Sequence, residues 1–170
     1  VKDGKFHWES KEEFPLYQYS ISVEGKSYPF LFSKGDLIDF SIKMNAKKFE
    51  VSMKGTRKAE DLFMNSEENA SGFYSYTVAQ KLYADEPLKF YEEAQNEWKS
   101  KVKKIEKYRT NENIFYGKDF EQFQKQKNAT QMLSAIYDYQ KMTSFSDSKF
   151  APPKEFLSEL NSVLKKPSSL

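Results

Sequence analysis

The sequence of 170 residues contains no cysteine and a single histidine. Without cysteine, the chain itself holds no disulfide, no thiolate nucleophile and no cysteine-ligated zinc. The one histidine, His7, cannot form a catalytic triad or a three-imidazole metal site by itself. We interpret His7 as an exposed strand residue beside Trp8, and the sequence predicts no cofactor and no metal site.

Long apolar runs are missing as well. No stretch reaches the roughly 18 apolar residues that indicate a transmembrane helix. No signal-peptide pattern stands at the start of the sequence. Because the chain begins with Val1 and ends in a Lys-Pro-Ser-Ser-Leu stretch, we expect a piece of a longer protein, in which residues 167–170 begin a linker.

An excess of charge of one sign is also lacking: the net charge is +2, from 27 basic and 25 acidic residues. Such a balance gives no field that would steer nucleic acid or a membrane surface to the chain. The densest basic run, residues 99–107, is expected to form a helix whose lysines cover its outer surface, with Val102 and Ile105 pointing inward. We therefore predict no nucleic-acid partner.

Aromatic residues are abundant: they make up 16% of the chain, with 15 Phe and 11 Tyr against only 6 Gly and 6 Pro. The 38% hydrophobic and 31% charged residues are typical of a globular protein, and the length is near that of one domain. We expect a core in which aromatic rings matter more than leucine and valine.

Residues 5–54 alternate between apolar and polar with a period of two, which is typical of half-buried antiparallel strands. We predict a β-meander of four strands, 15–24, 27–33, 37–44 and 48–54, with a shorter fifth strand at residues 6–8. Turn-forming residues such as Glu24-Gly25 and Gly35-Asp36 separate the runs. The residues expected to be buried together are Tyr19, Ile21, Ile38, Phe40, Phe49 and Val51.

Beyond Gly55 the apolar residues step by three or four, which indicates helices. The first long stripe consists of Leu88, Tyr91, Ala94, Trp98, Val102 and Ile105; a second is marked by Phe120, Phe123, Met132, Ile136 and Tyr139; a last helix opens at Pro152-Pro153. Strands followed by helices predict an α+β fold, with an antiparallel β region over residues 1–55 and four to five helices packed with it over residues 56–166.

Carboxylates give weak candidates for chemistry. Asp36 and Asp39 could hold a cation with Glu60 or Asp61, but the spacing of a calcium loop is absent, and Asp36 is expected to bond to the backbone of its own turn. Glu92, Glu93 and Glu97 are expected on the solvent side of the Trp98 helix, which argues against a glycosidase pair. The triplets starting at Asn69 and Asn128 match a glycosylation acceptor.

Aromatic residues near turns and strand ends are the candidate binding residues. Such rings could receive a sugar, a peptide or another domain, or they could line the seam between sheet and helices. The residues proposed for this aromatic patch are Phe14, Tyr28, Phe73, Tyr74 and Tyr76.

The stretch of residues 28–40, YPFLFSKGDLIDF, resembles a hairpin in which a Gly-Asp pair turns the chain between two hydrophobic strands. This hairpin occurs in the N-terminal domain of the TlpA-type thiol:disulfide interchange proteins, which are thioredoxin-like lipoproteins of the bacterial cell envelope. Lys34 stands where that family usually has proline. Segments 49–62, 88–91, 137–142 and 150–157 resemble, in order, the family's next strand and helix, its first long helix, the aromatic end of a later helix and the helix before the thioredoxin domain.

The resemblance implies a non-catalytic N-terminal module, periplasmic or anchored to the outer membrane, that positions a C-terminal thioredoxin-like domain of the same polypeptide or binds its protein or peptide client. The family's Cys-x-x-Cys pair has no counterpart here, so this chain is not expected to be an enzyme. The alternatives are a free-standing envelope protein that binds a glycan or peptide, and a hydrolase with a carboxylate pair, for which no convergent set of residues is visible.

Overall fold

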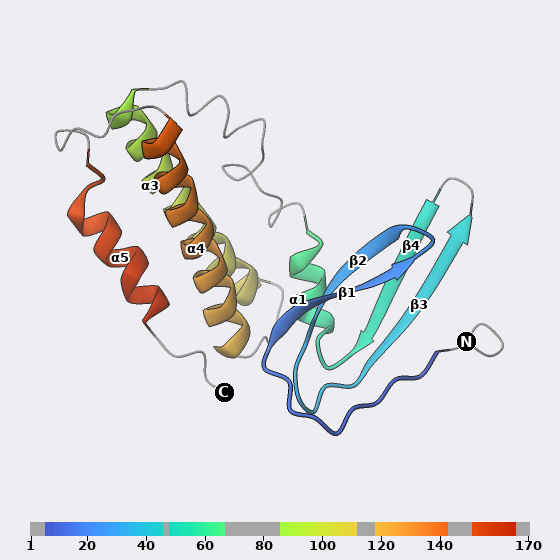
Figure 1. Cartoon of the computed structure of the whole chain (residues 1–170). Coiled ribbons are helices and arrows are strands. Elements are labelled where there is room, and N and C mark those ends of the chain that lie inside the picture. The colour runs from blue at the N-terminus through green and yellow to red at the C-terminus, as the bar shows by residue number, and fades with distance from the viewer. Residues whose placement is uncertain (1–5, 46–47, 67–85, 112–117, 143–150, 166–170) are drawn as a thin grey trace. The chain divides into compact units, whose positions relative to one another are not determined.

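The computed structural model describes residues 6–45, 48–66, 86–111, 118–142 and 151–165. The chain divides into two compact units, residues 1–58 and residues 59–170. The first unit holds the strands and the second holds the helices (Figure 1). The order of strands followed by helices agrees with the α+β class predicted from the sequence.

Two antiparallel hairpins make up the regular structure of the first unit. Strands β1 (Tyr17–Val23) and β2 (Lys26–Phe32) form one, and β3 (Ile38–Asn45) and β4 (Lys48–Gly55) form the other. Between β1 and β2, Glu24 and Gly25 have positive φ angles of 48° and 76°. A two-residue loop of this kind follows the natural twist of a hairpin, which explains why the predicted strand ends are close to the observed ones.

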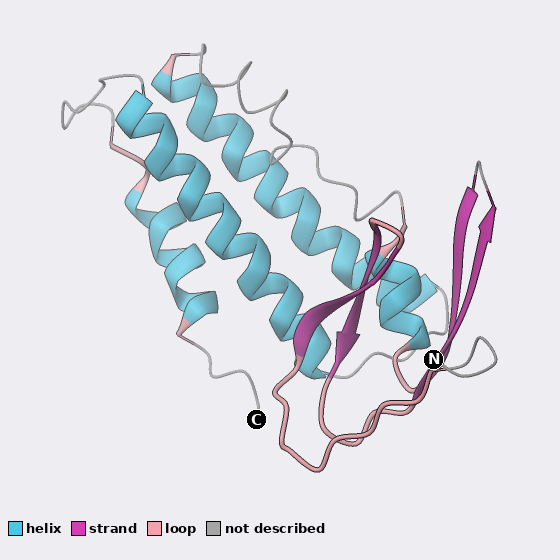
Figure 2. Ribbon diagram, turned by 45° about the vertical axis from the view of Figure 1, so that its right-hand side comes forward, coloured by secondary structure: helices cyan, strands magenta, loops and turns pink. Residues whose placement is uncertain are grey.

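The predicted continuous meander is wrong. Among the described residues, β1 pairs only with β2 and β3 only with β4, so two separate two-stranded sheets replace one sheet (Figure 2). Instead of pairing edge to edge, the hairpins meet through side chains of their apolar faces: Phe30 of β2 lies 4.8 Å from Phe40 of β3 between ring centroids. The alternation of residues fixes which face of a strand is apolar, but it does not fix which edges pair.

The connection between β2 and β3 gives the physical reason for this arrangement. The carboxylate of Asp36 accepts hydrogen bonds from the backbone N–H of Ser33 at 2.7 Å and from its hydroxyl at 2.9 Å. Gly35 has a φ of 83°. Asp36 thus bonds to its own turn, as predicted, and this closed turn redirects the chain after Phe32. At the same end of the second hairpin, where Gly55 pairs with Ile38, a Cβ on Gly55 would lie 1.9 Å from the carbonyl oxygen of Leu37, so only glycine fits there.

The predicted fifth strand at residues 6–8 is also wrong. Residues 6–16 contain no strand. The ring of Trp8 instead contacts Phe14 and Phe32, with centroids 5.8 and 5.7 Å away. This segment is therefore held to the first hairpin largely by aromatic side chains, since one backbone bond, from Lys34 N–H to the Phe14 carbonyl at 3.0 Å, supports it.

Burial in the first unit is weaker than predicted. The six residues expected to be buried together lie on the predicted faces but are only half-buried. Among the described residues of this unit, the buried hydrophobic side chains are Leu31 and Met53. Leu31 pairs with Gln18 and so lies on the opposite face of the hairpin from Tyr19. Two thin hairpins do not supply enough depth to bury their aromatic residues completely.

The second unit contains the short helix α1 (Lys58–Met64) and the longer helices α3 (Pro87–Asn111), α4 (Lys118–Met142) and α5 (Lys154–Leu164). The described residues hold this one short helix and three long ones, so the prediction is confirmed as strands followed by helices but not in its number of four to five helices. Helices α3, α4 and α5 lie side by side (Figures 1 and 2). Pro87 occupies the first position of α3, where its missing N–H costs nothing.

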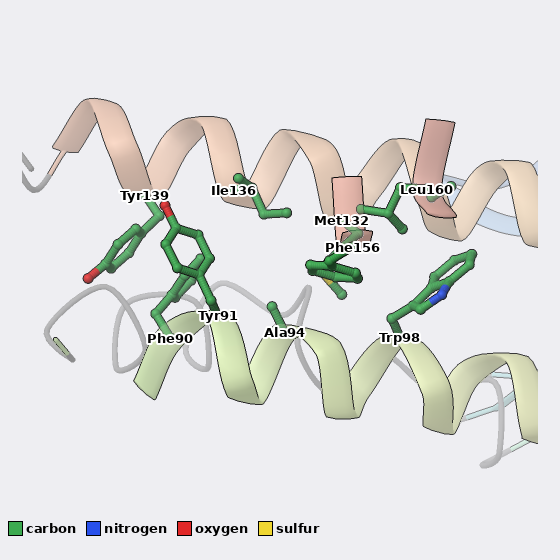
Figure 3. Packing of buried hydrophobic residues seen from close by; sticks show 10 residues of the cluster. Phe90, Tyr91, Ala94, Trp98, Met132, Ile136, Tyr139, Phe156 and Leu160 are labelled. Carbon is green, nitrogen blue, oxygen red and sulfur yellow. The ribbon is translucent and has the colours of Figure 1, made fainter. Parts of the chain in front are cut away.

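The core of the second unit lies between these three helices (Figure 3). Trp98 is 1% exposed, and its indole N–H donates to Glu159 of α5 at 2.7 Å. The rings of Phe90 and Tyr139 are stacked, with centroids 3.8 Å apart. The predicted stripe of α3 is confirmed except at Leu88, which is exposed in the first turn of the helix. The buried cluster consists of Phe90, Tyr91, Ala94, Trp98, Ala129, Met132, Ile136, Tyr139, Phe156 and Leu160.

Candidate functional site

Six aromatic rings contact one another at the end of the first hairpin that lies away from its turn, and we call this group the aromatic cluster. Ring centroids of neighbouring members are 5.7–6.4 Å apart. The members are Trp8, Phe14, Tyr17, Tyr19, Phe30 and Phe32.

The strand register brings four of these rings to one face. Tyr17 is the cross-strand partner of Phe32, and Tyr19 is the partner of Phe30. Residues paired in this way on an antiparallel hairpin project on the same side. Trp8 and Phe14 are added by the segment before β1, where Glu13 forms an ion pair with Lys34 beside the bond from Lys34 N–H to the Phe14 carbonyl.

The cluster is partly open to solvent. Trp8 is 53% exposed and Tyr17 is 61% exposed, and Phe6, two residues before Trp8, is 70% exposed. The other members are half-buried. Large aromatic side chains that remain exposed next to one another are a usual mark of an interaction surface on a protein.

The structure brings together part of the patch predicted from the sequence. Phe14 belongs to the aromatic cluster, and Tyr28 lies further along the same face, with its ring 6.3 Å from that of Phe40. Phe40 in turn contacts Phe30 of the cluster. The other three predicted residues, Phe73, Tyr74 and Tyr76, lie outside the described residues.

Sequence reasoning did not include Trp8, Tyr17, Tyr19, Phe30 or Phe32 in this patch. Four of the cluster's members could have been predicted from the sequence. A two-residue turn at Glu24-Gly25 fixes the pairing of Tyr17 with Phe32 and of Tyr19 with Phe30. No pattern in the sequence indicates that Trp8 packs on Phe32, since the contact depends on the path of the irregular segment before β1.

The candidate cation site around Asp36 is occupied by hydrogen-bond donors of the protein. Besides Ser33, Thr56 donates its hydroxyl to Asp36 at 2.8 Å, and Arg57 donates its Nε–H at 2.8 Å. The side chains of Asp36 and Arg57 are 9% and 11% exposed. Asp39 lies on the polar face of β3 opposite Lys54, while Glu60 and Asp61 belong to α1 in the other unit. Within the part of the chain that the structure describes, no group of three or more His, Cys, Asp or Glu residues is arranged to hold a metal ion.

The other candidates on the helices take structural positions. Glu93 lies 3.9 Å from Lys89, and Glu97 lies 3.9 Å from Lys101, as ion pairs one helical turn apart on α3. Asn128, which begins a glycosylation triplet, is buried on α4, so a glycan could not be attached there without opening the bundle. The corresponding triplet at Asn69 lies outside the described residues.

The lysines of residues 99–107 are expected to spread over the outer surface of the helix, and Lys101 departs from this because it is buried. Burial lowers the pKa of Lys101, and Glu97 raises it again in part. Burial also lowers the pKa of Lys127 on α4, and the positive charge of Lys101 adds to that effect. Both ammonium groups are therefore less favourable in the folded protein than in water.

A pH dependence of stability follows from these two lysines. In the unfolded chain a lysine binds its proton with a pKa of 10.5, so between the lowered folded pKa values and pH 10.5 the unfolded state holds more protons. The free energy of unfolding contributed by these groups should therefore rise with pH in that window and be lowest below it. Urea unfolding at several pH values up to 10.5 should show a smaller rise for Lys101→Met/Lys127→Met than for the wild type. Parallel curves would contradict the assignment, and Lys99→Met, at an exposed position, is the matched control.

A shallow depression of 380 Å³ lies on α4 and α5, lined by Thr130, Leu133, Ser134, Tyr137, Asp138 and Leu164. It is open to solvent, and Asp138 is the one carboxylate among these residues. A ligand site usually encloses most of its ligand and directs several polar groups at it, so this depression is a weaker candidate than the aromatic cluster.

No protein-family model, no curated protein and no solved structure matches the chain. None of the helices in the described ranges is both long enough and apolar enough to cross a membrane.

Proposed function

We propose that the chain is a non-catalytic protein-binding module, of the kind that precedes the redox domain in TlpA-type proteins of the bacterial cell envelope. The observation that carries the proposal is the aromatic cluster, in which Trp8 and Tyr17 are exposed and available to a partner. In the described helices α3, α4 and α5 most rings are buried, and Tyr137 is exposed. The Gly35-Asp36 turn, with its bonds to Ser33, supports the resemblance to the family's hairpin.

In this proposal the partner of the module is a thioredoxin-like domain of the same polypeptide or the protein client of that domain. Joining two domains by a short linker gives an effective concentration of about a millimolar, so a weak contact through a few rings is enough to be populated. The site of action is the periplasm or the outer membrane. A parent gene without a Cys-x-x-Cys domain would contradict this reading and favour a free-standing binding protein for a glycan or peptide.

The test compares the complete parent protein with its thioredoxin-like domain alone on one panel of disulfide-bonded client proteins. We expect the complete protein to reduce or oxidise some clients faster, and we expect Trp8→Ala/Tyr17→Ala to remove that advantage. Tyr137→Ala is the matched control, because this exposed tyrosine lies on α4 in the other unit. Equal rates on every client would remove the client-binding role.

A further inference from the structure

The surface of the aromatic cluster is ridged rather than flat. The ring of Trp8 is inclined by 56° to Phe14 and by 64° to Phe32, and Phe14 and Tyr19 are inclined by 88°. Sugar rings stack best on an open, level aromatic face, whereas steeply inclined rings leave notches between edges and faces. The steep inclinations of these rings therefore favour a polypeptide ligand over a saccharide.

The segment that carries Trp8 is rich in carboxylates. Residues 6–16 carry Glu9, Glu12 and Glu13 against one lysine, Lys11. Glu13 is in contact with Lys34, while the side chain of Glu9, next to Trp8, is 79% exposed and approaches His7 at 4.0 Å. Glu12 is exposed as well. Where carboxylates lie beside exposed indole and phenol rings, two groups attract a cation: the carboxylates by their negative charge, and the rings by their negative faces.

We propose that the Trp8 end of the aromatic cluster binds an extended protein segment that contains arginine or lysine, with the cationic side chain against Trp8 and Tyr17 and near Glu9 and Glu12. This inference rests on the proposed function and adds the chemistry of the partner to it. An arginine side chain suits the site best, because its planar group stacks on rings while its N–H groups reach carboxylates.

The chain provides its own reporter, since its two tryptophans differ in exposure: Trp8 is open to solvent and Trp98 is buried. In a Trp98→Phe background, fluorescence reports on Trp8 alone. The probe is a pentapeptide amide with two arginines separated by glycines, and its control is the same peptide with glutamine in place of arginine. Calorimetry with the wild-type chain repeats the measurement in case Trp98→Phe disturbs the fold.

We expect saturable binding of the arginine peptide and at least about fivefold weaker binding of the glutamine peptide. Trp8→Ala should weaken binding to a similar degree by calorimetry, and so should Glu9→Gln/Glu12→Gln at low salt. The effect of the carboxylates should shrink at 1 M salt, where the screening length is about 3 Å. The matched controls, Tyr137→Ala and Glu24→Gln, change exposed residues away from the cluster and should leave binding unchanged.

The outcomes separate this inference from the proposed function. Equal binding of both peptides in a Trp8-dependent manner would overturn the cationic partner and leave a protein-binding module. Binding of the arginine peptide without dependence on Trp8 would overturn the site. A response to maltohexaose or chitohexaose with no response to either peptide would overturn both proposals in favour of a glycan-binding protein.

Discussion

Replacing Trp98 by alanine is expected to lower the free energy of unfolding of the helical unit by about 3–5 kcal/mol, the usual range for emptying a buried aromatic site. Trp98 is 1% exposed and belongs to a cluster that also includes Met132, Phe156 and Leu160 from the two neighbouring helices. Because three helices meet there, the bundle cannot collapse onto the vacated volume by moving one side chain. Urea unfolding followed by helical circular dichroism measures the loss, since the described helices lie in this unit.

Two further variants divide the effect of Trp98 into volume and hydrogen bonding. Trp98→Phe keeps most of the ring and loses the indole N–H that donates to Glu159, so a loss of only about 1–2 kcal/mol is expected. Glu159→Leu removes the acceptor and should cost about 1–3 kcal/mol, because it leaves the buried indole donor without it. A loss below about 1 kcal/mol for Trp98→Ala would show that the ring does not fill the core in solution.

The helical unit could be predicted well wherever one face of a helix is buried. The stripe of α3 gave the inward positions of Tyr91, Trp98 and Ile105 correctly. Helix α4 was harder, because its buried residues include Gln124 and Asn128 as well as the predicted Met132 and Ile136. That helix contacts α1, through Phe63 and Phe120 at 5.6 Å, as well as α3 and α5, so no single apolar stripe describes it.

The strands could be predicted in position but not in arrangement. The period of two placed Phe40 and Ile42 on the apolar face of one strand and Val51 and Met53 on that of the next. In the structure Ile42 pairs with Val51, and Phe40 pairs with Met53. Which strand neighbours which depends on the connection after Phe32, where Asp36 is bonded to residues far along the chain. A sequence pattern that repeats every two residues carries no information on that choice.

For the candidate site too, features set by neighbouring residues could be predicted, and contacts between residues distant in the sequence could not. Phe14 and Tyr28 could be singled out as rings near turns, but the open end of the aromatic cluster is made by Trp8, which reaches Phe32 across 24 positions of sequence. Exposure also depends on tertiary packing: Tyr17 alternates like the half-buried Tyr19 and yet remains 61% exposed. Trp8 and Tyr17, the exposed members of the cluster, are therefore residues whose exposure the local periodicity of the sequence does not predict.

Replacing Asp36 by alanine is expected to destabilise the β unit by about 3–5 kcal/mol, the cost of removing one partner of a buried ion pair. Asp36 accepts hydrogen bonds from Ser33, Thr56 and Arg57 at 2.7–2.9 Å. Its removal leaves the guanidinium of Arg57 largely out of solvent without this carboxylate. It also releases the turn after β2 from the end of β4, where no continuous sheet among the described strands holds the two hairpins together.

A double-mutant cycle separates the contribution of the Asp36–Arg57 ion pair from that of the other hydrogen bonds that Asp36 accepts. Asp36→Asn keeps the shape of the side chain and should be less destabilising than Asp36→Ala, because its amide oxygen still accepts from Ser33 or Thr56. Asp36→Asn/Arg57→Met removes both charges and should cost less than the sum of the single variants, since no buried charge is left unpaired.

Trp8 fluorescence in a Trp98→Phe background follows the unfolding of this unit, with Asp39→Asn, on the exposed face of β3, as the matched control. Additive losses would mean that Asp36 and Arg57 stabilise the two hairpins independently, and a loss no larger for Asp36→Ala than for Asp39→Asn would contradict the role of Asp36 in joining them.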